Sequence, residues 1–173
     1  EISFSEIGVK EVELSSADRD WILSAQYYFL NDTKDGAKIG SARDYTTVEI
    51  LEALWATAVH VGVEPKRFIV QLYNESRFNP NVVGAAGERG IGQFKKSTSD
   101  YKGYDWYQMS SGISGFAYQA KAAAEYVKSV GEVAYNGGGD QGSNYKSRIT
   151  DKVIAIEQVS QDCDLSQIAF CES

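Results

Sequence analysis

Residues 48–61, VEILEALWATAVHV, constrain the fold more than any other part of the chain, because apolar residues occupy nearly their whole helical circumference. Thr46 or Thr47 can cap the start of a helix here, and Gly62 can end it. A helix that is apolar on most sides is stable only when other elements cover it. We therefore expect 48–61 to form a central helix of the domain.

The rest of the chain also carries helical spacing. Ser15 and Asp18 form a capping-box pattern at the start of an apolar-periodic stretch, and Pro65 suits the first turn of another. Two more stretches show the same period: 113–130, which Gly131 should end, and a last helix that turns Ile149, Val153 and Ile156 inward. At most a short hairpin fits near 82–91.

These patterns predict a mainly α fold in one domain spanning 1–173. We expect a core at about 47–158, an N-terminal helix at 15–31 packed on it, and a C-terminal tail at 160–173.

Composition excludes some classes of function. A net charge of −7 and a pI near 4.8 argue against nucleic-acid binding, which depends on clustered Lys and Arg. The same charge provides no electrostatic attraction to an anionic membrane or cell wall. The chain has no apolar run long enough to predict a membrane span.

Metal binding is not predicted, since one His and two Cys would need carboxylates to complete a zinc site.

Cys163 and Cys171 could close a short disulfide loop or stay unpaired, and the sequence leaves both open. His60 falls beside Glu49 and Glu52 on the polar strip of its helix, so we expect it to face solvent.

Glu75 is the candidate catalytic residue. It shares one face of the predicted helix with Phe68 and Leu72 and lies near the negative end of the helix dipole. Both burial and the dipole disfavour the ionised carboxylate and raise its pKa, which suits a general acid. The alternative is a solvated residue at the helix end, followed by an ordinary glycine-rich loop.

An aromatic-rich connection at 97–112 carries Tyr101, Tyr104, Trp106 and Tyr107. These rings could contact sugar faces or cover the core, and the sequence favours neither.

Several short motifs now occur in a fixed order: Glu75-Ser76, Asn79-Pro80, Gly90-Ile91-Gly92-Gln93, Ala134-Tyr135-Asn136 with the glycines after it, and Tyr145 with Arg148-Ile149. Together they resemble the lytic transglycosylases related to goose-type lysozyme, over about 68–153. That resemblance implies a lysozyme-like, two-lobed helical domain with a glycan-binding cleft.

The resemblance also implies roles for the residues that match. Glu75 would be the single acid/base, and seven residues would contact substrate: Ser76, Gly90, Ile91, Gly92, Gln93, Tyr135 and Asn136. Gly84, Gly87-Glu88 and Gly92 stand where the family has Ser, Gly-Ala and Met. Glu88 is thus an added carboxylate, interpreted here as a charged loop tip in preference to a second catalytic group.

The whole chain further resembles the muralytic enzymes of cystoviruses, which are enveloped double-stranded RNA bacteriophages. This implies a virion enzyme that opens the host cell wall from the periplasm, acts on peptidoglycan glycan strands without a cofactor, and associates with other virion proteins. Such enzymes have been classed as endopeptidases, so cleavage of the peptide stems is the alternative. For an endopeptidase, the best candidate nucleophile is Ser99, with Lys102 as its partner. The two form a Ser-x-x-Lys pattern, which is common by chance. A non-catalytic wall-binding protein is a third hypothesis.

Overall fold

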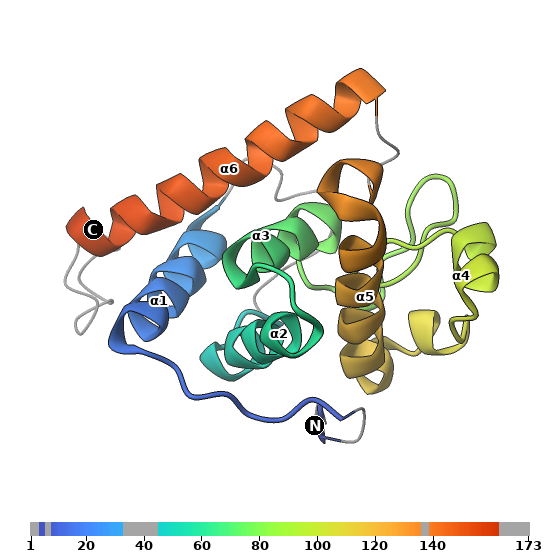
Figure 1. Cartoon of the computed structure of the whole chain (residues 1–173), viewed down its shortest axis with the longest axis horizontal. Helices are drawn as coiled ribbons and strands as arrows, with labels where there is room; N and C mark the ends of the chain where they lie inside the picture. The colour runs from blue at the N-terminus through green and yellow to red at the C-terminus, as the bar shows by residue number, and fades with distance from the viewer. Residues whose placement is uncertain (1–3, 6–7, 33–44, 136–138, 163–173) are drawn as a thin grey trace.

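The computed structural model describes residues 4–5, 8–32, 45–135 and 139–162 and confirms a mainly α fold (Figure 1). The described helices are α1 (Ser16–Asn31), α2 (Val48–Val61), α3 (Pro65–Ser76), α4 (Lys96–Lys102), α5 (Phe116–Tyr135) and α6 (Gly139–Asp162), with 3-10 turns η3 (Gln108–Ser110) and η4 (Gly112–Gly115). None of the helices in this part of the chain combines the length and hydrophobicity needed to cross a membrane.

The predicted helix starts are confirmed at α1, α2 and α3, and the predicted stops are confirmed at α1 and α2. Ser15 and Asp18 form the full reciprocal capping box of α1. Thr47 rather than Thr46 caps α2, accepting a hydrogen bond from Ile50 N, and Gly62 ends that helix in the left-handed conformation. The α3 helix begins at Pro65, as predicted.

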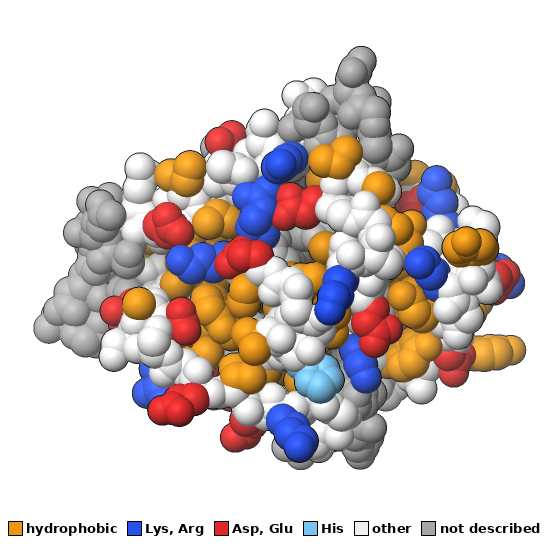
Figure 2. Space-filling model, in the orientation of Figure 1, with side chains coloured by type: hydrophobic (Ala, Val, Ile, Leu, Met, Phe, Trp, Pro, Cys, Tyr) orange, Lys and Arg blue, Asp and Glu red, His pale blue; other side chains and the backbone are white. Residues whose placement is uncertain are grey.

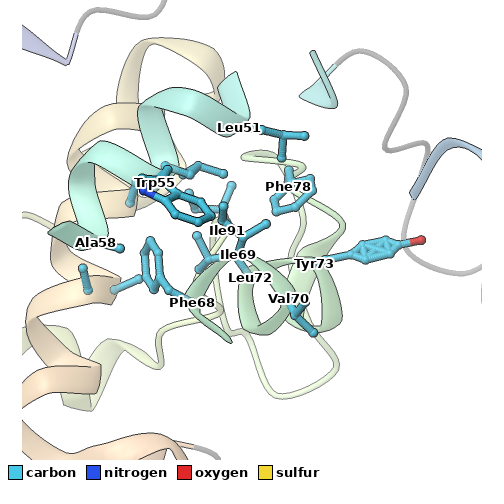
Figure 3. Packing of buried hydrophobic residues seen from close by; sticks show 14 of the residues in the cluster. Leu51, Trp55, Ala58, Phe68, Ile69, Val70, Leu72, Tyr73, Phe78 and Ile91 are labelled. Atoms are coloured by element: carbon cyan, nitrogen blue, oxygen red, sulfur yellow. The ribbon is translucent and has the colours of Figure 1, made fainter. Parts of the chain in front are cut away.

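The core lies mainly between α2 and α3, where side chains of both helices point toward one another (Figure 3). Leu51 and Leu54 of α2 are fully buried, whereas Glu52 and His60 of the same helix are exposed. Helix α2 packs against α1, α3 and α5, and helix α3 packs against α2 and α6, with residues 68–73 all buried. The prediction of a central helix at 48–61 is therefore confirmed, and α2 keeps a solvent-facing polar strip.

Helix α6 runs along one side of the molecule across α1, α3 and the end of α5 (Figure 1). Ile149 and Ile156 are fully buried beneath it and Val153 packs against the core, as the sequence predicts. This long helix also places Tyr145 over the end of α3, where the candidate acid lies.

The aromatic-rich connection is more structured than the sequence predicts, since it contains most of α4, all of η3 and the start of η4. Helix α5 starts at Phe116, so Ile113 falls in η4 and is 44% exposed, outside the predicted apolar stripe. The reason lies in local packing: Gly112 has φ 60, and a Cβ on Gly115 would clash with Gln108 O.

Gly131 ends the long helical stretch of α5, as the sequence predicts. Its φ of 83 and ψ of 162 break the helix, and helical turns resume as far as Tyr135. This break sets the direction of the last turns of α5, which carry Tyr135 to the candidate site. The predicted hairpin near 82–91 is reduced to isolated β-bridges joining Arg89 to Val83 and to Phe94.

Candidate active site

A pocket of about 490 Å³ opens at the C-terminal end of α3. Its wall comes from α3, the glycine-rich segment after it, the start of α4, and α5; the lining residues are Glu75, Glu88, Gln93, Phe94, Lys95, Thr98, Tyr126, Ala134 and Tyr135. The structure thus brings Glu75, Gln93 and Tyr135, which the motifs single out, to one cavity. Asn136, Cys163 and Cys171 lie outside the described residues.

Glu75 lies in the last turn of α3 and is half-buried. Phe68 and Leu72, which share its face, are each only 1% exposed, so the apolar stripe predicted for this helix exists. Tyr145 of α6 donates a hydrogen bond from its hydroxyl to Glu75 Oε1 at 2.9 Å. The carboxyl group is therefore fixed from the α6 side and faces the pocket on the other.

Burial raises the pKa of Glu75 to about 7, and the nearby Glu88 carboxylate adds to the rise. The hydrogen bond from Tyr145 and the charge of Arg148 oppose it. A carboxyl group with such a pKa holds its proton on about half the molecules at neutral pH. It can donate a proton and then accept one without a large free-energy penalty for either step.

Ser76 and Ile91 position the glycine-rich segment from within the core. The Ser76 hydroxyl donates to Ile91 O at 2.7 Å, and the Ile91 N–H donates to Gln119 Oε1 at 2.9 Å. Both side chains are fully buried, so neither can touch a ligand in this structure. We expect them to act by holding the loop in place, in contrast to the substrate contact that the resemblance implies.

Gly90 and Gly92 are required by the protein's own packing. A Cβ on Gly90 would lie 2.5 Å from Gln119 Oε1 and 2.9 Å from Met109 O, and a Cβ on Gly92 would lie 2.6 Å from Tyr135 Oη. Glycines in such a loop would let a glycan approach the backbone closely, because they have no Cβ, but here other atoms of the protein already occupy these Cβ positions.

Gln93 closes the loop. Its Nε2 donates to Val82 O at 3.1 Å and to Gly90 O at 2.9 Å, and its backbone has a φ of 52. Left-handed backbone is uncommon outside glycine, so these two side-chain bonds help to hold an otherwise unfavourable turn. The loop shape, and with it one wall of the pocket, depends on this amide.

Tyr135 forms the opposite wall. Its hydroxyl donates to Gly92 O at 2.6 Å, and its ring packs on Phe94 and Tyr126 at centroid distances of 5.8 and 5.2 Å. Burial raises the pKa of Tyr135 well above its usual value, so it stays a neutral hydrogen-bond donor. The bond to Gly92 O ties the end of α5 to the glycine-rich segment.

Glu88, interpreted from the sequence as a charged loop tip, reaches the candidate site. It is half-buried and lines the same pocket as Glu75. A Cβ built on Gly84 would clash with Glu88 Oε2 and lie 2.6 Å from Gln93 Oε1. The two departures from the family pattern are therefore linked, because the glycine at 84 leaves the space that the Glu88 carboxylate occupies.

Sequence reasoning missed four pocket residues, Phe94, Lys95, Thr98 and Tyr126, and gave Tyr145 no role. Tyr145 and Ile149 are four residues apart, so the inward direction of Ile149 was a usable signal for Tyr145. Lys95, Thr98 and Tyr126 reach the pocket through the placement of α4 and α5, which no local pattern indicates.

The residues considered for peptide-bond cleavage are not arranged for it. Ser99 is fully buried and its hydroxyl donates to Tyr104 O at 3.1 Å, whereas Lys102 Nζ reaches Ser129 Oγ at 3.3 Å. His60 is exposed on α2, as predicted. In the described ranges, no group of three or more His, Cys, Asp or Glu side chains is placed to hold a metal ion.

No family model matches the chain, and comparisons with curated proteins and with solved structures find no match either. A function for this chain must therefore be inferred from the chemistry of the pocket.

Tyr145→Phe should move the pH dependence of any reaction that needs protonated Glu75. The lost hydrogen bond lowers the pKa of Glu75 in the wild type, so its removal raises that pKa and shifts the alkaline limb of the activity profile to higher pH. Tyr118→Phe, which removes a hydroxyl bonded to Asp105 N, is the matched control and should leave the profile in place. Equal profiles for the two variants would contradict a positioning role for Tyr145.

Proposed function

We propose that this protein cleaves peptidoglycan at the glycosidic bond between N-acetylmuramic acid and N-acetylglucosamine, with Glu75 as a single acid/base. One observation carries the proposal: a half-buried carboxyl group with a pKa of about 7, hydrogen-bonded to Tyr145, lines a pocket together with Tyr135 and Gln93. The order of motifs similar to lytic transglycosylases gives the substrate class. We further propose the lysozyme-like two-lobed cleft that this similarity implies, and a virion enzyme of the cystovirus kind acting in the host periplasm.

The chemistry needs one protein carboxyl group. Protonated Glu75 donates to the glycosidic oxygen as the bond breaks, and the substrate's own acetamido group stabilises the oxocarbenium-like centre. The Glu75 carboxylate then removes the proton from the muramic acid C6 hydroxyl, which attacks the anomeric carbon and closes a 1,6-anhydro ring. Glu75 ends protonated and ready for the next cycle.

Tyr145 and Tyr135 would support this cycle from opposite sides. Tyr145 holds Glu75 Oε1, so Oε2 remains for the transferred proton. Tyr135 stays neutral, and its bond to Gly92 O keeps the wall of the pocket closed against the glycine-rich segment. Precise placement of this kind contributes to catalysis because reacting atoms must start close together.

A second candidate is a hydrolase with two carboxylates, favoured by the position of Glu88 in the same pocket. Glu88 would activate a water molecule on the face of the sugar opposite the donated proton. Cleavage of the peptide stem and wall binding without catalysis are outcomes of the same test.

Mass spectrometry of purified peptidoglycan after digestion separates these candidates. We expect anhydro-muropeptides as the main products. Ordinary reducing ends would support the two-carboxylate hydrolase, and freed peptide stems would support an endopeptidase. Peptidoglycan that is bound by the protein but not cleaved would indicate a binding protein.

A further inference from the structure

One face of α4 leads outward from the Glu75 pocket. Lys95, which precedes α4, and Thr98 both line the pocket. Tyr101 and Lys102 follow Thr98 by three and four residues, so they continue the same helix face beyond the rim of the pocket. Ser99 turns the other way and is fully buried.

Contacts join this face to the pocket wall. Lys102 Nζ lies 6.0 Å from the centroid of the Tyr101 ring and 5.6 Å from that of Tyr126. Tyr126 lines the pocket and packs on Tyr135 with ring centroids 5.2 Å apart. A row of rings therefore runs from Tyr135 through Tyr126 to Tyr101, with the Lys102 ammonium between the last two.

Tyr101 is 86% exposed, so its ring contributes little to the core. A single exposed aromatic residue is ordinary on a protein surface, and Tyr107, at 84%, is a similar case. What distinguishes Tyr101 is its position at the end of a row that starts in the pocket. Its ring is exposed next to a cation at the end of that row.

Charge points to the kind of ligand. The chain as a whole is acidic, with a net charge of −7, yet Lys95 and Lys102 both lie along this face. In Figure 2, hydrophobic, basic and acidic side chains lie beside one another around α4. An aromatic face suits the apolar face of a pyranose ring, and a lysine ammonium pairs with a carboxylate.

We propose that Tyr101 and Lys102 form an outer subsite for a glycan strand that bears peptide stems. Tyr101 stacks on a sugar ring beyond those held in the pocket, and Lys102 pairs with a carboxylate of a stem. The inference rests on the proposed function, because the strand must enter the Glu75 pocket to reach this face.

Binding to insoluble peptidoglycan tests the subsite without a need for turnover. In a Glu75→Gln background, adding Tyr101→Ala should weaken co-sedimentation with purified peptidoglycan by about 10-fold, whereas the matched control Tyr107→Ala should not change it. Tyr101→Phe should retain binding, because the ring remains. Equal affinities for the Tyr101→Ala and Tyr107→Ala proteins would overturn the proposal.

The cation has its own test. Lys102→Met should weaken binding to stem-bearing peptidoglycan by about 3-fold and have little effect on strands freed of stems by an amidase. Lys96→Met is the control, since Lys96 is on the same helix and pairs with Asp100 on the surface. An equal loss on both substrates would overturn the carboxylate pairing.

The outcomes separate the subsite from the reaction. Binding that depends on Tyr101, without release of anhydro products by the wild type, would refute the proposed chemistry and support the subsite. Release of anhydro products, together with binding that does not change when Tyr101 is substituted, would support the proposed chemistry and refute the subsite. A wild-type protein that neither binds nor cleaves peptidoglycan would refute both.

Discussion

Glu75→Gln should reduce the release of muropeptides from purified peptidoglycan by at least about 100-fold, the usual scale for losing an acid/base group. The substitution keeps the size of the side chain and an oxygen that can accept the Tyr145 hydrogen bond. It removes the exchangeable proton on which both steps of the proposed reaction depend. Product quantification by mass spectrometry at matched protein concentrations measures the loss.

The folded state should tolerate this change. Because the pKa of Glu75 is raised from 4.5 to about 7, its ionisation opposes folding as pH increases through that interval. The Glu75→Gln substitution removes this cost, so the variant should be at least as stable as the wild type above pH 7 in urea denaturation. A loss of activity that accompanied unfolding would therefore argue against a catalytic role.

Glu88→Gln is the informative companion, since Glu88 lines the same pocket. A one-carboxylate mechanism predicts that this variant keeps most of its activity, with an alkaline limb shifted to lower pH because Glu88 raises the pKa of Glu75. Two inactive but folded variants would instead support the two-carboxylate hydrolase. A fully active Glu75→Gln protein would refute glycan cleavage by this carboxyl group.

The helices were predictable where local chemistry decides them. Caps at Ser15 and Thr47 and the first-turn Pro65 satisfy or remove backbone donors within a few residues, so their effect does not depend on the rest of the fold. The predicted start of α5 was wrong because Ile113 fits the helical period but belongs to η4. The left-handed backbone of Gly112 and the close approach of Gly115 to Gln108 O interrupt the helical pattern there.

The site was predictable in part for a similar reason. Glu75 is on the apolar stripe of its own helix, so periodicity alone shows that its carboxyl group points inward. The position of Glu88 depends on the space left by Gly84 across a turn, and the contact of Tyr145 with Glu75 joins residues 70 positions apart. Contacts of that kind are fixed by how the elements pack and leave no periodic signal.

Gly90→Ala should lower the free energy of unfolding by about 2–4 kcal/mol, the largest stability effect we expect from removing a glycine of the loop. An alanine at φ 79 costs about 1 kcal/mol or more for left-handed backbone, and overpacking of a filled site adds about 1–3 kcal/mol. The new methyl group would lie 2.5 Å from Gln119 Oε1, the oxygen that accepts the Ile91 N–H. Gln119 must move, and the loop then loses one of its anchors.

Gly87→Ala provides the control, because Gly87 has nearly the same φ, 82, in the same loop and no atom within 4 Å of the added Cβ. The backbone cost and the entropy change of the unfolded chain are then shared by both variants, so their difference isolates the packing contribution. We expect Gly87→Ala to cost about 1 kcal/mol and to keep activity, and Gly90→Ala to lose activity as the pocket wall shifts. Equal denaturation midpoints would show that the segment packs less tightly against Gln119 and Met109 than the structure indicates, and that Gly90 serves the ligand instead.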